Sequence, residues 1–262
     1  MKNFPGKSIS CVYDPIGPVK VFDDGNKRYL TFGDNDEQSC MLKANPALLQ
    51  YDYNRAMLLV LLFCQPKHIA ILGLGGASLT HSLMNAVLDA NITVVELRQV
   101  VIDVAYKYFA LPLAPRLTVI QDNALDYLAE AAQNGIGGSG GSAGSFDVLF
   151  SDLFLAEGLE TRQLTDQFLT DAAALLSDDG WLVINALEEY RSEQLLHGLL
   201  AQYFGTVFEC ITEDGNWVII AGKRAEKSDE PVSFKALFPQ AKTWSKRLGF
   251  SLIAHLKHLK RV

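Results

Sequence analysis

Apolar runs of strand length alternate with stretches of helical periodicity through the middle of the chain. The run from Ile69 to Leu74 is continuous, as in a strand that is buried on both faces of a sheet. Four similar runs follow, and a stretch of helix length separates each run from the next. This alternation predicts βαβ units and a mostly parallel sheet with right-handed crossovers. The other apolar runs lie at 92–97, 117–120, 148–150 and 181–184, and the helical stretches at 77–88, 100–109, 124–132 and 160–176.

The end of this region has a different pattern. After a helical stretch at 189–203, two β-like runs at 206–211 and 217–221 flank Glu213-Asp214-Gly215-Asn216, which is a strong hairpin signal. A closing hairpin makes the last strand antiparallel. We therefore expect an α/β fold with a Rossmann-like sheet of seven strands, which is typical of adenosylmethionine-dependent transferases.

The N-terminal region alternates apolar and polar residues over short distances. Such runs lie at 8–13, 19–22 and 29–32, and Asp24-Gly25 lies between the last two. Asp-Gly between alternating runs predicts a β-hairpin. We therefore expect residues 1–45 to form a small antiparallel β-element.

The charge is unevenly distributed along the chain. The formal net charge is −7, and we expect no nucleic-acid partner for so acidic a protein. Residues 223–262 hold ten Lys/Arg and three Asp/Glu, whereas the first 222 residues hold thirteen and twenty-seven. We interpret residues 46–222 as a Rossmann-like, nucleoside-binding catalytic domain and residues 223–262 as a basic C-terminal helical tail. The tail should fold back on the acidic body or be solvated, with an anionic partner as the alternative, and should be separable from the chemistry.

Composition indicates a globular protein, which we expect in the cytoplasm. Apolar residues make up 49% of the chain, enough for a sizeable core. The longest strongly apolar stretch, 56–64, is far shorter than a membrane span, and the N-terminus lacks the apolar core of a signal peptide. The four cysteines are widely spaced without a CxxC pair, so we expect no metal site and no disulfide framework. The Gly/Ser-rich stretch 135–145 is predicted to be a flexible surface loop.

Candidate chemistry begins at the first strand of the parallel sheet, whose end is rich in glycine. Gly73, Gly75 and Gly76 would let the backbone approach a ligand closely, although a tight strand-to-helix turn without a ligand is the alternative. Glu96, 21 residues after Gly75, ends the second strand and could accept both hydroxyls of a ribose. The alternative for Glu96 is a satisfied or solvated surface carboxylate. Because Ser78 breaks the G-x-G-x-x-G spacing, a nucleoside with a thioether or sulfonium arm fits better than NAD.

The third and fourth strands add further candidates at the same edge of the sheet. Asn123 and Ala124 follow the third strand, where a polar side chain could contact an adenine amino group, although capping of the next helix by Asp122 or Asn123 is equally good chemistry. Asp152 lies at the carboxyl end of the fourth strand, where ligands bind in open parallel sheets. Its alternative role is that of a turn or cap carboxylate.

With these motifs in order, the chain resembles the spermidine synthase family, the aminopropyltransferases, over roughly residues 18–221. The family combines a small N-terminal β-domain with a methyltransferase-like domain and usually forms dimers. The resemblance implies transfer of an aminopropyl group from decarboxylated S-adenosylmethionine to an amine, which leaves methylthioadenosine. The stretches that carry the resemblance are Tyr29 to Gly33 with Gln38, Tyr53, Ile71 to Gly76, Val94 to Leu97, Asn123 to Leu128 and Phe146 to Asp152.

The resemblance assigns roles to single residues. Glu96 matches the acid that binds ribose, Asn123-Ala124 matches the pair beside adenine with an amide in place of an acid, and Gln38 falls in a matched cofactor-binding stretch. Asp152 matches the Asp that orients and deprotonates the attacking amine, and Tyr53 falls near the tyrosine that helps to hold it.

Two positions depart from the family. Gly76 stands where the family usually has an Asp for the ammonium of the cofactor, and Leu155 stands where it has a second active-site Asp. Glu157 or Glu160 is a candidate substitute. Three functions therefore stay open: an aminopropyltransferase, a methyltransferase that uses intact S-adenosylmethionine, and a catalytically weak module that binds a nucleoside or a partner.

Overall fold

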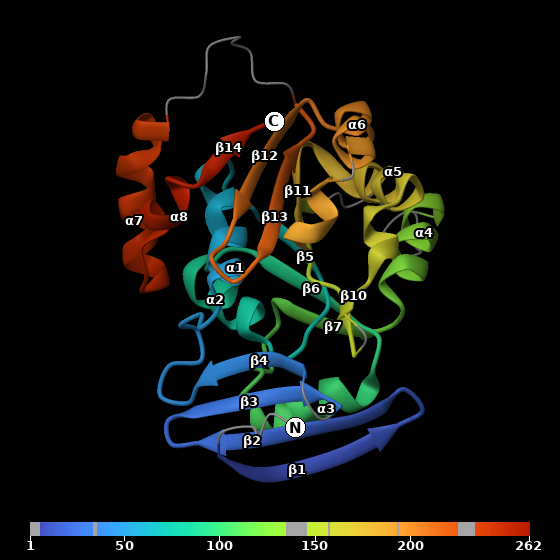
Figure 1. Cartoon of the computed structure of the whole chain (residues 1–262), viewed down its shortest axis with the longest axis vertical. Coiled ribbons are helices and arrows are strands. Elements are labelled where there is room, and N and C mark those ends of the chain that lie inside the picture. The colour runs from blue at the N-terminus through green and yellow to red at the C-terminus, as the bar shows by residue number, and fades with distance from the viewer. Residues whose placement is uncertain (1–5, 34–35, 135–145, 157, 193, 225–233) are drawn as a thin grey trace.

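A computed structural model describes residues 6–33, 36–134, 146–156, 158–192, 194–224 and 234–262. The predicted loop at 135–145 and Glu157 lie outside the described residues. The chain forms a large mixed sheet with helices on both faces and a small antiparallel sheet at one end (Figure 1). The α/β fold class predicted from the sequence is confirmed.

The large sheet has the strand order β14-β12-β13-β11-β8-β5-β6-β7. From β5 the chain first builds β6 and β7 on one side and then crosses to β8 on the other side of β5. The order of the strands therefore reverses at β5, and the switch point lies beyond its carboxyl end. All seven expected strands are present, and β13 is antiparallel to both of its neighbours. The strands are β5 (His68–Leu72), β6 (Asn91–Glu96), β7 (Leu117–Gln121), β8 (Phe146–Ser151), β11 (Leu176–Leu187), β12 (Thr206–Ile211), β13 (Asn216–Gly222) and β14 (Leu259–Arg261).

Helices cover both faces of this sheet (Figure 1). One face carries α4 (Ala124–Asn134), α5 (Asp166–Leu175) and α6 (Gln194–Tyr203). The other carries α1 (Asp52–Met57), α2 (Ser78–Ala86), α7 (Phe238–Leu248) and α8 (Leu252–Leu256). Short 3-10 helices are η1 (Leu58–Leu62), η2 (Thr161–Leu164), η3 (Glu188–Ser192) and η4 (Phe234–Leu237). Within the described ranges, no helix is long and apolar enough to cross a membrane.

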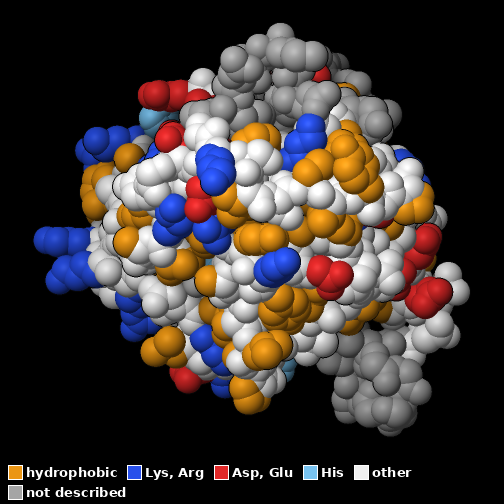
Figure 2. Space-filling model, turned by 90° about the horizontal axis from the view of Figure 1, so that it is seen from below, with side chains coloured by type: hydrophobic (Ala, Val, Ile, Leu, Met, Phe, Trp, Pro, Cys, Tyr) orange, Lys and Arg blue, Asp and Glu red, His pale blue; other side chains and the backbone are white. Residues whose placement is uncertain are grey.

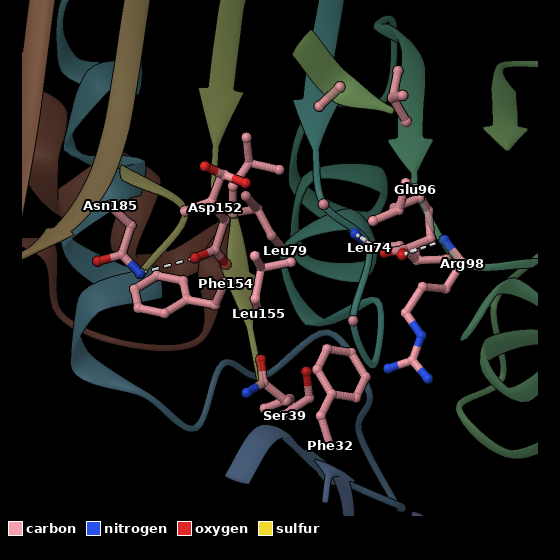
Figure 3. A pocket seen from close by; sticks show the side chains of 18 of the residues that line it. Phe32, Ser39, Leu74, Leu79, Glu96, Arg98, Asp152, Phe154, Leu155 and Asn185 are labelled. Atoms are coloured by element: carbon pink, nitrogen blue, oxygen red, sulfur yellow. Dashed lines mark hydrogen bonds between the residues drawn. The ribbon is translucent and has the colours of Figure 1, made fainter. Parts of the chain in front are cut away.

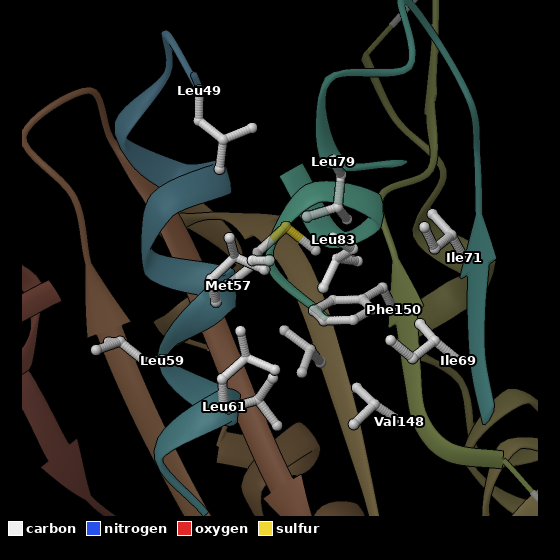
Figure 4. Packing of buried hydrophobic residues seen from close by; sticks show 14 of the residues in the cluster. Leu49, Met57, Leu59, Leu61, Ile69, Ile71, Leu79, Leu83, Val148 and Phe150 are labelled. Carbon is white, nitrogen blue, oxygen red and sulfur yellow. The ribbon is translucent and has the colours of Figure 1, made fainter. Parts of the chain in front are cut away.

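The apolar stretch at 56–64 is explained by burial on every side. Ala56 to Leu62 continue α1 into η1, and each of these residues is almost completely inaccessible to solvent. Figure 4 shows Met57 and Leu61 facing Leu83 of α2 and Phe150 of β8. A helix that is apolar all round is stable only inside a core, and each such side chain contributes about 1.5–3 kcal/mol on burial.

The C-terminal segment is part of the core rather than an appendage. Trp244, Leu248, Leu252 and Leu256 of its helices are buried against the α1 and α2 side of the sheet. β14 then pairs antiparallel with β12 and adds an eighth strand to the seven expected. The segment therefore folds back on the body, as the charge balance suggested. That the segment is separable from the chemistry stays a prediction, and its removal would expose this apolar surface.

The small sheet is a four-stranded antiparallel meander, with its strands in chain order. It packs on α3 (Gln99–Tyr108) through Val19, Val21 and Leu30, which contact Val101 and Val104. Figure 2 views the molecule from this end, where apolar side chains are interspersed with charged ones. The strands are β1 (Lys7–Asp14), β2 (Gly17–Asp24), β3 (Lys27–Phe32) and β4 (Asp36–Leu42).

The sequence pattern did not predict β4, and this strand is irregular. Leu30 of β3 pairs with Ser39, whereas the next residue, Thr31, pairs with Glu37. Gln38 is therefore an extra residue in the ladder, which defines a β-bulge. Bulges redirect side chains next to binding sites. Here the bulge turns three consecutive residues of β4 toward one cavity.

Candidate active site

A cavity of about 510 Å³ lies between the carboxyl ends of the parallel strands and the small sheet. Both sheets contribute to its walls, as Figure 3 shows for Glu96 and Asp152 on one side and Phe32 and Ser39 on the other. A short hairpin of β9 (Phe154–Leu155) and β10 (Gly158–Leu159) adds apolar side chains. The predicted site residues that line the cavity are Gln38, Tyr53, Gly73, Gly75, Glu96, Asn123, Ala124 and Asp152.

The glycine loop is shaped by close backbone contacts. Gly73 and Gly75 have φ angles of 93° and 51°, which L-residues rarely adopt. A Cβ atom on Gly73 would clash with the backbone carbonyl oxygen of Asp152, and one on Gly75 would lie 2.8 Å from the Oγ of Ser39. Glycine is therefore required at both positions, and the loop after β5 packs closely against Asp152 at the end of β8 and Ser39 of β4.

Gly76 lies off the cavity. Its N–H donates to the Oγ of Ser39 at 2.8 Å. A Cβ atom at this position would lie 2.7 Å from the Cβ of Ser39 and 3.0 Å from the ring of Phe109. A side chain at position 76 would thus meet the small sheet and α3. The structure places Gly76 in a packing role, whereas the sequence predicted contact with the cofactor.

Glu96 ends β6 and is buried, with only 7% of its surface exposed. Its Oε2 accepts from the N–H of Leu74 at 3.0 Å and its Oε1 from the N–H of Arg98 at 2.9 Å. Burial raises the pKa of Glu96, and these backbone hydrogen bonds oppose the shift. A solvated surface role is therefore wrong. Each carboxylate oxygen has a second lone pair, so Glu96 can hold the glycine loop and still accept a ribose hydroxyl.

Asn123 caps the next helix and also lines the cavity, while its contact with an adenine stays a prediction. Its Oδ1 accepts from the N–H of Leu125 at 2.9 Å, which caps α4. The same residue and Ala124 line the cavity beside Leu97 and Leu125. The capping bond does not use the amide nitrogen of Asn123. This wall therefore offers apolar surface and one polar group, as a purine base requires.

Asp152 follows β8 and is half-buried, and its side chain points into the cavity (Figure 3). Its Oδ1 accepts from Nδ2 of Asn185 at 2.8 Å, and the Oδ1 of Asn185 accepts from Nδ2 of Asn216 at 3.0 Å. Burial raises the pKa of Asp152 to about 6, against hydrogen bonds from Asn185, Asn54 and Tyr53. A carboxyl group with a pKa near neutrality is suited to proton transfer.

Tyr53 lies in the first turn of α1, next to this carboxylate. Burial and the negative charge of Asp152 raise the pKa of Tyr53 well above its ordinary value, so the phenol stays protonated and can donate. The groups that hydrogen-bond to Asp152 are therefore neutral: Tyr53, Asn54 and Asn185.

Leu155, which stands at the position of a missing acid, and Glu160, a candidate substitute, both line the cavity. Leu155 gives the cavity an apolar wall. Glu160 lines the cavity, but both of its oxygens accept from Arg162, at 2.9 and 2.7 Å. The Arg162 side chain holds the pKa of Glu160 below its usual range. Because this charge is already paired, Glu160 is a poor substitute for a free acid.

Sequence reasoning missed several residues that line the cavity. Asn185 could have been noticed, since it is a polar residue within an apolar strand at its carboxyl end. Glu37 and Ser39 of β4 carried no such signal, because the alternation of this strand is broken by the bulge. Within the described residues, no three His, Cys, Asp or Glu side chains are grouped as a metal site requires. The missed residues include Glu37, Ser39, Asn54, Arg98, Asn185 and Asn216.

Comparison with known sequences gives matches along most of the chain. A polyamine aminopropyltransferase of Neisseria meningitidis is 29% identical over 232 residues, which cover 87% of this chain and 84% of the relative. A protein of the same name from Chromobacterium violaceum is 28% identical over 259 residues, or 97% and 94% of the two chains. No protein-family model matches the chain.

Solved structures show the same fold at lower identity. A probable spermidine synthase from Corynebacterium glutamicum superposes with a TM-score of 0.71 at 15% identity over 95% of both chains. Human methyltransferase-like protein 13, in complex with SAH, gives a TM-score of 0.61 at 17% identity over 79% of this chain and 93% of that one. The resemblance predicted from the motifs is confirmed: the chain is similar in sequence to polyamine aminopropyltransferases and shares the fold of a probable spermidine synthase.

Proposed function

We propose that the protein is a transferase that moves an aminopropyl group from an adenosylmethionine-type donor to an amine. The observation that carries this proposal is the shared cavity of Glu96 and Asp152. Glu96 is a buried acceptor suited to a nucleoside, and Asp152 is a half-buried acid with a pKa of about 6. A nucleoside donor and a nucleophile can thus bind side by side, which is the main requirement of a displacement at carbon.

The reaction is a substitution at the carbon that joins the aminopropyl group to the sulfonium. The amine lone pair forms the new C–N bond, the C–S bond breaks, and its electron pair stays on sulfur in methylthioadenosine. Asp152 orients the amine and accepts its proton. Tyr53 and Asn185 hydrogen-bond to the carboxyl group and hold it in place. Since the sulfonium is already a good leaving group, no acid is needed at sulfur.

The donor arm and the adenine have separate surroundings. We assign the ribose to Glu96, the adenine to the wall of Asn123 and Ala124, and the arm to the side of Gly73, Gly75 and Gln38. The glycine loop itself carries no carboxylate. Both donors are therefore proposed, with an amine as the acceptor. Decarboxylated S-adenosylmethionine transfers an aminopropyl group and intact S-adenosylmethionine an aminocarboxypropyl group, and each leaves methylthioadenosine.

The test is a transfer assay on the full chain with each donor and a panel of amines. Formation of methylthioadenosine together with an aminopropylated amine supports the proposal. Methyl transfer from intact S-adenosylmethionine, with release of its demethylated product, would favour a methyltransferase. A methyltransferase is the second candidate because Gly76 replaces the Asp that would repel the carboxylate of the intact donor. Tight nucleoside binding without turnover would indicate a binding module. A homodimer is also proposed, from the resemblance, and light scattering measures it.

A further inference from the structure

One carboxylate in the lining of the cavity, that of Glu37, has no assigned role. Glu37 lies on β4 of the small sheet, beside the bulge at Gln38, and its side chain is exposed at the cavity. Glu37 is not among the residues to which the family resemblance assigns a role, and it is not one of the two departures from the family, Gly76 and Leu155. Glu37 comes from a different element from either of them.

Two tyrosines connect Glu37 to Asp152. The hydroxyl of Tyr51 donates to Oε1 of Glu37. The ring of Tyr51 stacks on that of Tyr53, with centroids 5.7 Å apart and planes inclined by 14°. Tyr53 in turn hydrogen-bonds to Asp152. The two carboxylates are therefore hydrogen-bonded to the two members of one stacked tyrosine pair, and both line the same cavity.

Tyr51 is held in this arrangement by its place in the chain. It is the residue that precedes α1, with an extended backbone (φ −96°, ψ 142°), so Tyr51 and Tyr53 lie on either side of the start of the helix. Burial and the Glu37 carboxylate raise the pKa of Tyr51, which keeps its hydroxyl protonated as a donor. Tyr51 does not itself line the cavity and is a positioning residue for Glu37.

We propose that Glu37 is the specificity-determining residue that binds the far ammonium of a diamine acceptor whose near amine lies at Asp152. This inference rests on the proposed function. A diamine has a cation at each end and an apolar stem between them. Glu37 and Asp152 both line the cavity, and its walls also carry the aromatic Tyr53 and the apolar Leu155. Aromatic and aliphatic surfaces suit a methylene stem, and the carboxylates suit the ammonium groups.

Position explains how Glu37 can act where Leu155 cannot. The side chain of Leu155 is apolar and contributes no charge, and Glu160 is paired with Arg162. Glu37 accepts a neutral phenol at one oxygen, so its negative charge is not cancelled by that bond. The small sheet thus supplies a carboxylate to the lining of the cavity.

The experiment is calorimetry on the full chain saturated with methylthioadenosine, with butane-1,4-diamine and butylamine as the two probes. Butylamine has the same stem with one cation, so it needs Asp152 alone. We expect the diamine to bind about fivefold more tightly than butylamine, as a partly exposed ion pair allows. Glu37→Gln should remove this preference while the affinities for butylamine and methylthioadenosine stay unchanged.

Two matched variants complete the design. Tyr51→Phe keeps the ring stacking and removes the donor to Glu37, and should weaken diamine binding by about twofold. Glu130→Gln makes the same change of charge on the exposed face of α4 and should leave all three affinities unchanged. A structural role for Glu37 would instead weaken both amines alike in Glu37→Gln.

Equal affinity of the unmodified protein for both amines, no binding of the diamine, or equal losses for both amines in Glu37→Gln would each overturn the inference. The proposed function fails separately. If no donor yields transfer to any amine while diamine binding depends on Glu37, the transferase assignment is wrong and the diamine subsite stands. Transfer to butylamine and diamine alike, without an effect of Glu37, would support the transferase and exclude the diamine subsite.

Discussion

Arg98 and Asp14 form a bidentate ion pair that joins the small sheet to the nucleoside side of the cavity. Nε and Nη2 of Arg98 lie 2.8 Å from the two carboxylate oxygens of Asp14, and Nη2 also donates to the carbonyl of Gly17 at 2.7 Å. The guanidinium lies 4.8 Å from the centroid of the Phe32 ring. The backbone N–H of Arg98 also donates to Glu96, so Arg98 links the β1–β2 turn to the residue that we propose binds the ribose.

This ion pair should matter for stability. The side chain of Arg98 is 5% exposed, so Asp14→Asn would leave a buried cation without its charged partner. We expect a loss of about 2–3 kcal/mol in the free energy of unfolding, measured by urea denaturation. Asp23→Asn, which breaks the more exposed Arg28–Asp23 pair of the same sheet, is the matched control and should cost about 1 kcal/mol or less.

The pH dependence of that stability gives a second check. The hydrogen bond from Arg98 holds the pKa of Asp14 below its usual range. The folded state therefore binds this proton less readily than the unfolded state. The stabilisation is present above the unfolded pKa of about 4 and is lost as pH falls through the lowered folded pKa. An Asp14→Asn variant that keeps the acid sensitivity of the unmodified protein would show that the pair contributes little.

Glu96 should be required for nucleoside binding and also for the local fold. In Glu96→Gln, the amide nitrogen would face a backbone N–H where the carboxylate oxygen accepted one, at Leu74 or at Arg98. We expect methylthioadenosine affinity to fall by about tenfold, and the free energy of unfolding to fall by about 1–2 kcal/mol. Calorimetry and urea denaturation measure the two effects. Unchanged affinity in a folded variant would remove Glu96 from the nucleoside site.

The strand ends could be predicted from the sequence because their signals are local. Glu96 and Asp152 directly follow apolar runs, and parallel strands bring their carboxyl ends to one edge. The partner of Arg98 could not be predicted in this way, since Asp14 lies 84 residues earlier in another sheet. The same holds for Ser39, which contacts the glycine loop only because a bulged strand, β4, packs there.

The C-terminal segment illustrates a different limit of sequence reasoning. Its charge balance indicates that it folds back on the body but does not identify the surface it covers. Trp244 and Leu252 pack into a core built mainly by residues 49–111, and β14 extends the sheet at β12. Charge and periodicity describe the segment itself, whereas its docking depends on apolar surface that the rest of the chain leaves open.

At Asp152 we expect activity and stability to change in opposite directions as the pH rises. Burial raises its pKa to about 6, so the ionised form that accepts a proton is populated above that pH. We expect kcat/KM for transfer to rise with pH through about 6, and Asp152→Asn to lower kcat at least about a hundredfold. For stability the sign is opposite: the contribution of this group is present below the unfolded pKa of about 4 and is lost as pH rises toward about 6.

Asp152→Asn should therefore be slightly more stable than the unmodified protein at neutral pH, by about 1 kcal/mol, while it loses turnover. Urea denaturation at about pH 5 and about pH 7.5, on either side of the raised pKa, measures the change. The control is Asp122→Asn, an acid beside the cavity wall that caps the next backbone N–H and does not line the cavity. A variant at Asp152 that turns over normally would assign the proton transfer to another group.

Donor choice depends on what stands at the end of the donor arm. In the family that the chain resembles, an Asp in the glycine loop attracts the ammonium of the decarboxylated cofactor and repels the carboxylate of intact S-adenosylmethionine. Unit charges about 4 Å apart interact with about 4 kcal/mol at an effective dielectric constant of about 20, so one residue can decide the preference. Gly76 removes both effects, and the structure shows that the position cannot simply regain an acid, since Ser39 and Phe109 occupy the space of its Cβ.

We therefore expect intact S-adenosylmethionine to bind with an affinity within about tenfold of its decarboxylated form. Parallel calorimetric titrations of the two donors measure the ratio directly, with methylthioadenosine, which lacks the arm, as the reference for the nucleoside alone. Glu37→Gln distinguishes binding of the donor from binding of the acceptor. If Glu37 binds only the acceptor, the ratio of the two donor affinities is the same in this variant as in the unmodified protein. A preference above about a hundredfold for the decarboxylated donor would mean that another acid has taken the place of the missing Asp, and its loss in Glu37→Gln would identify that acid as Glu37.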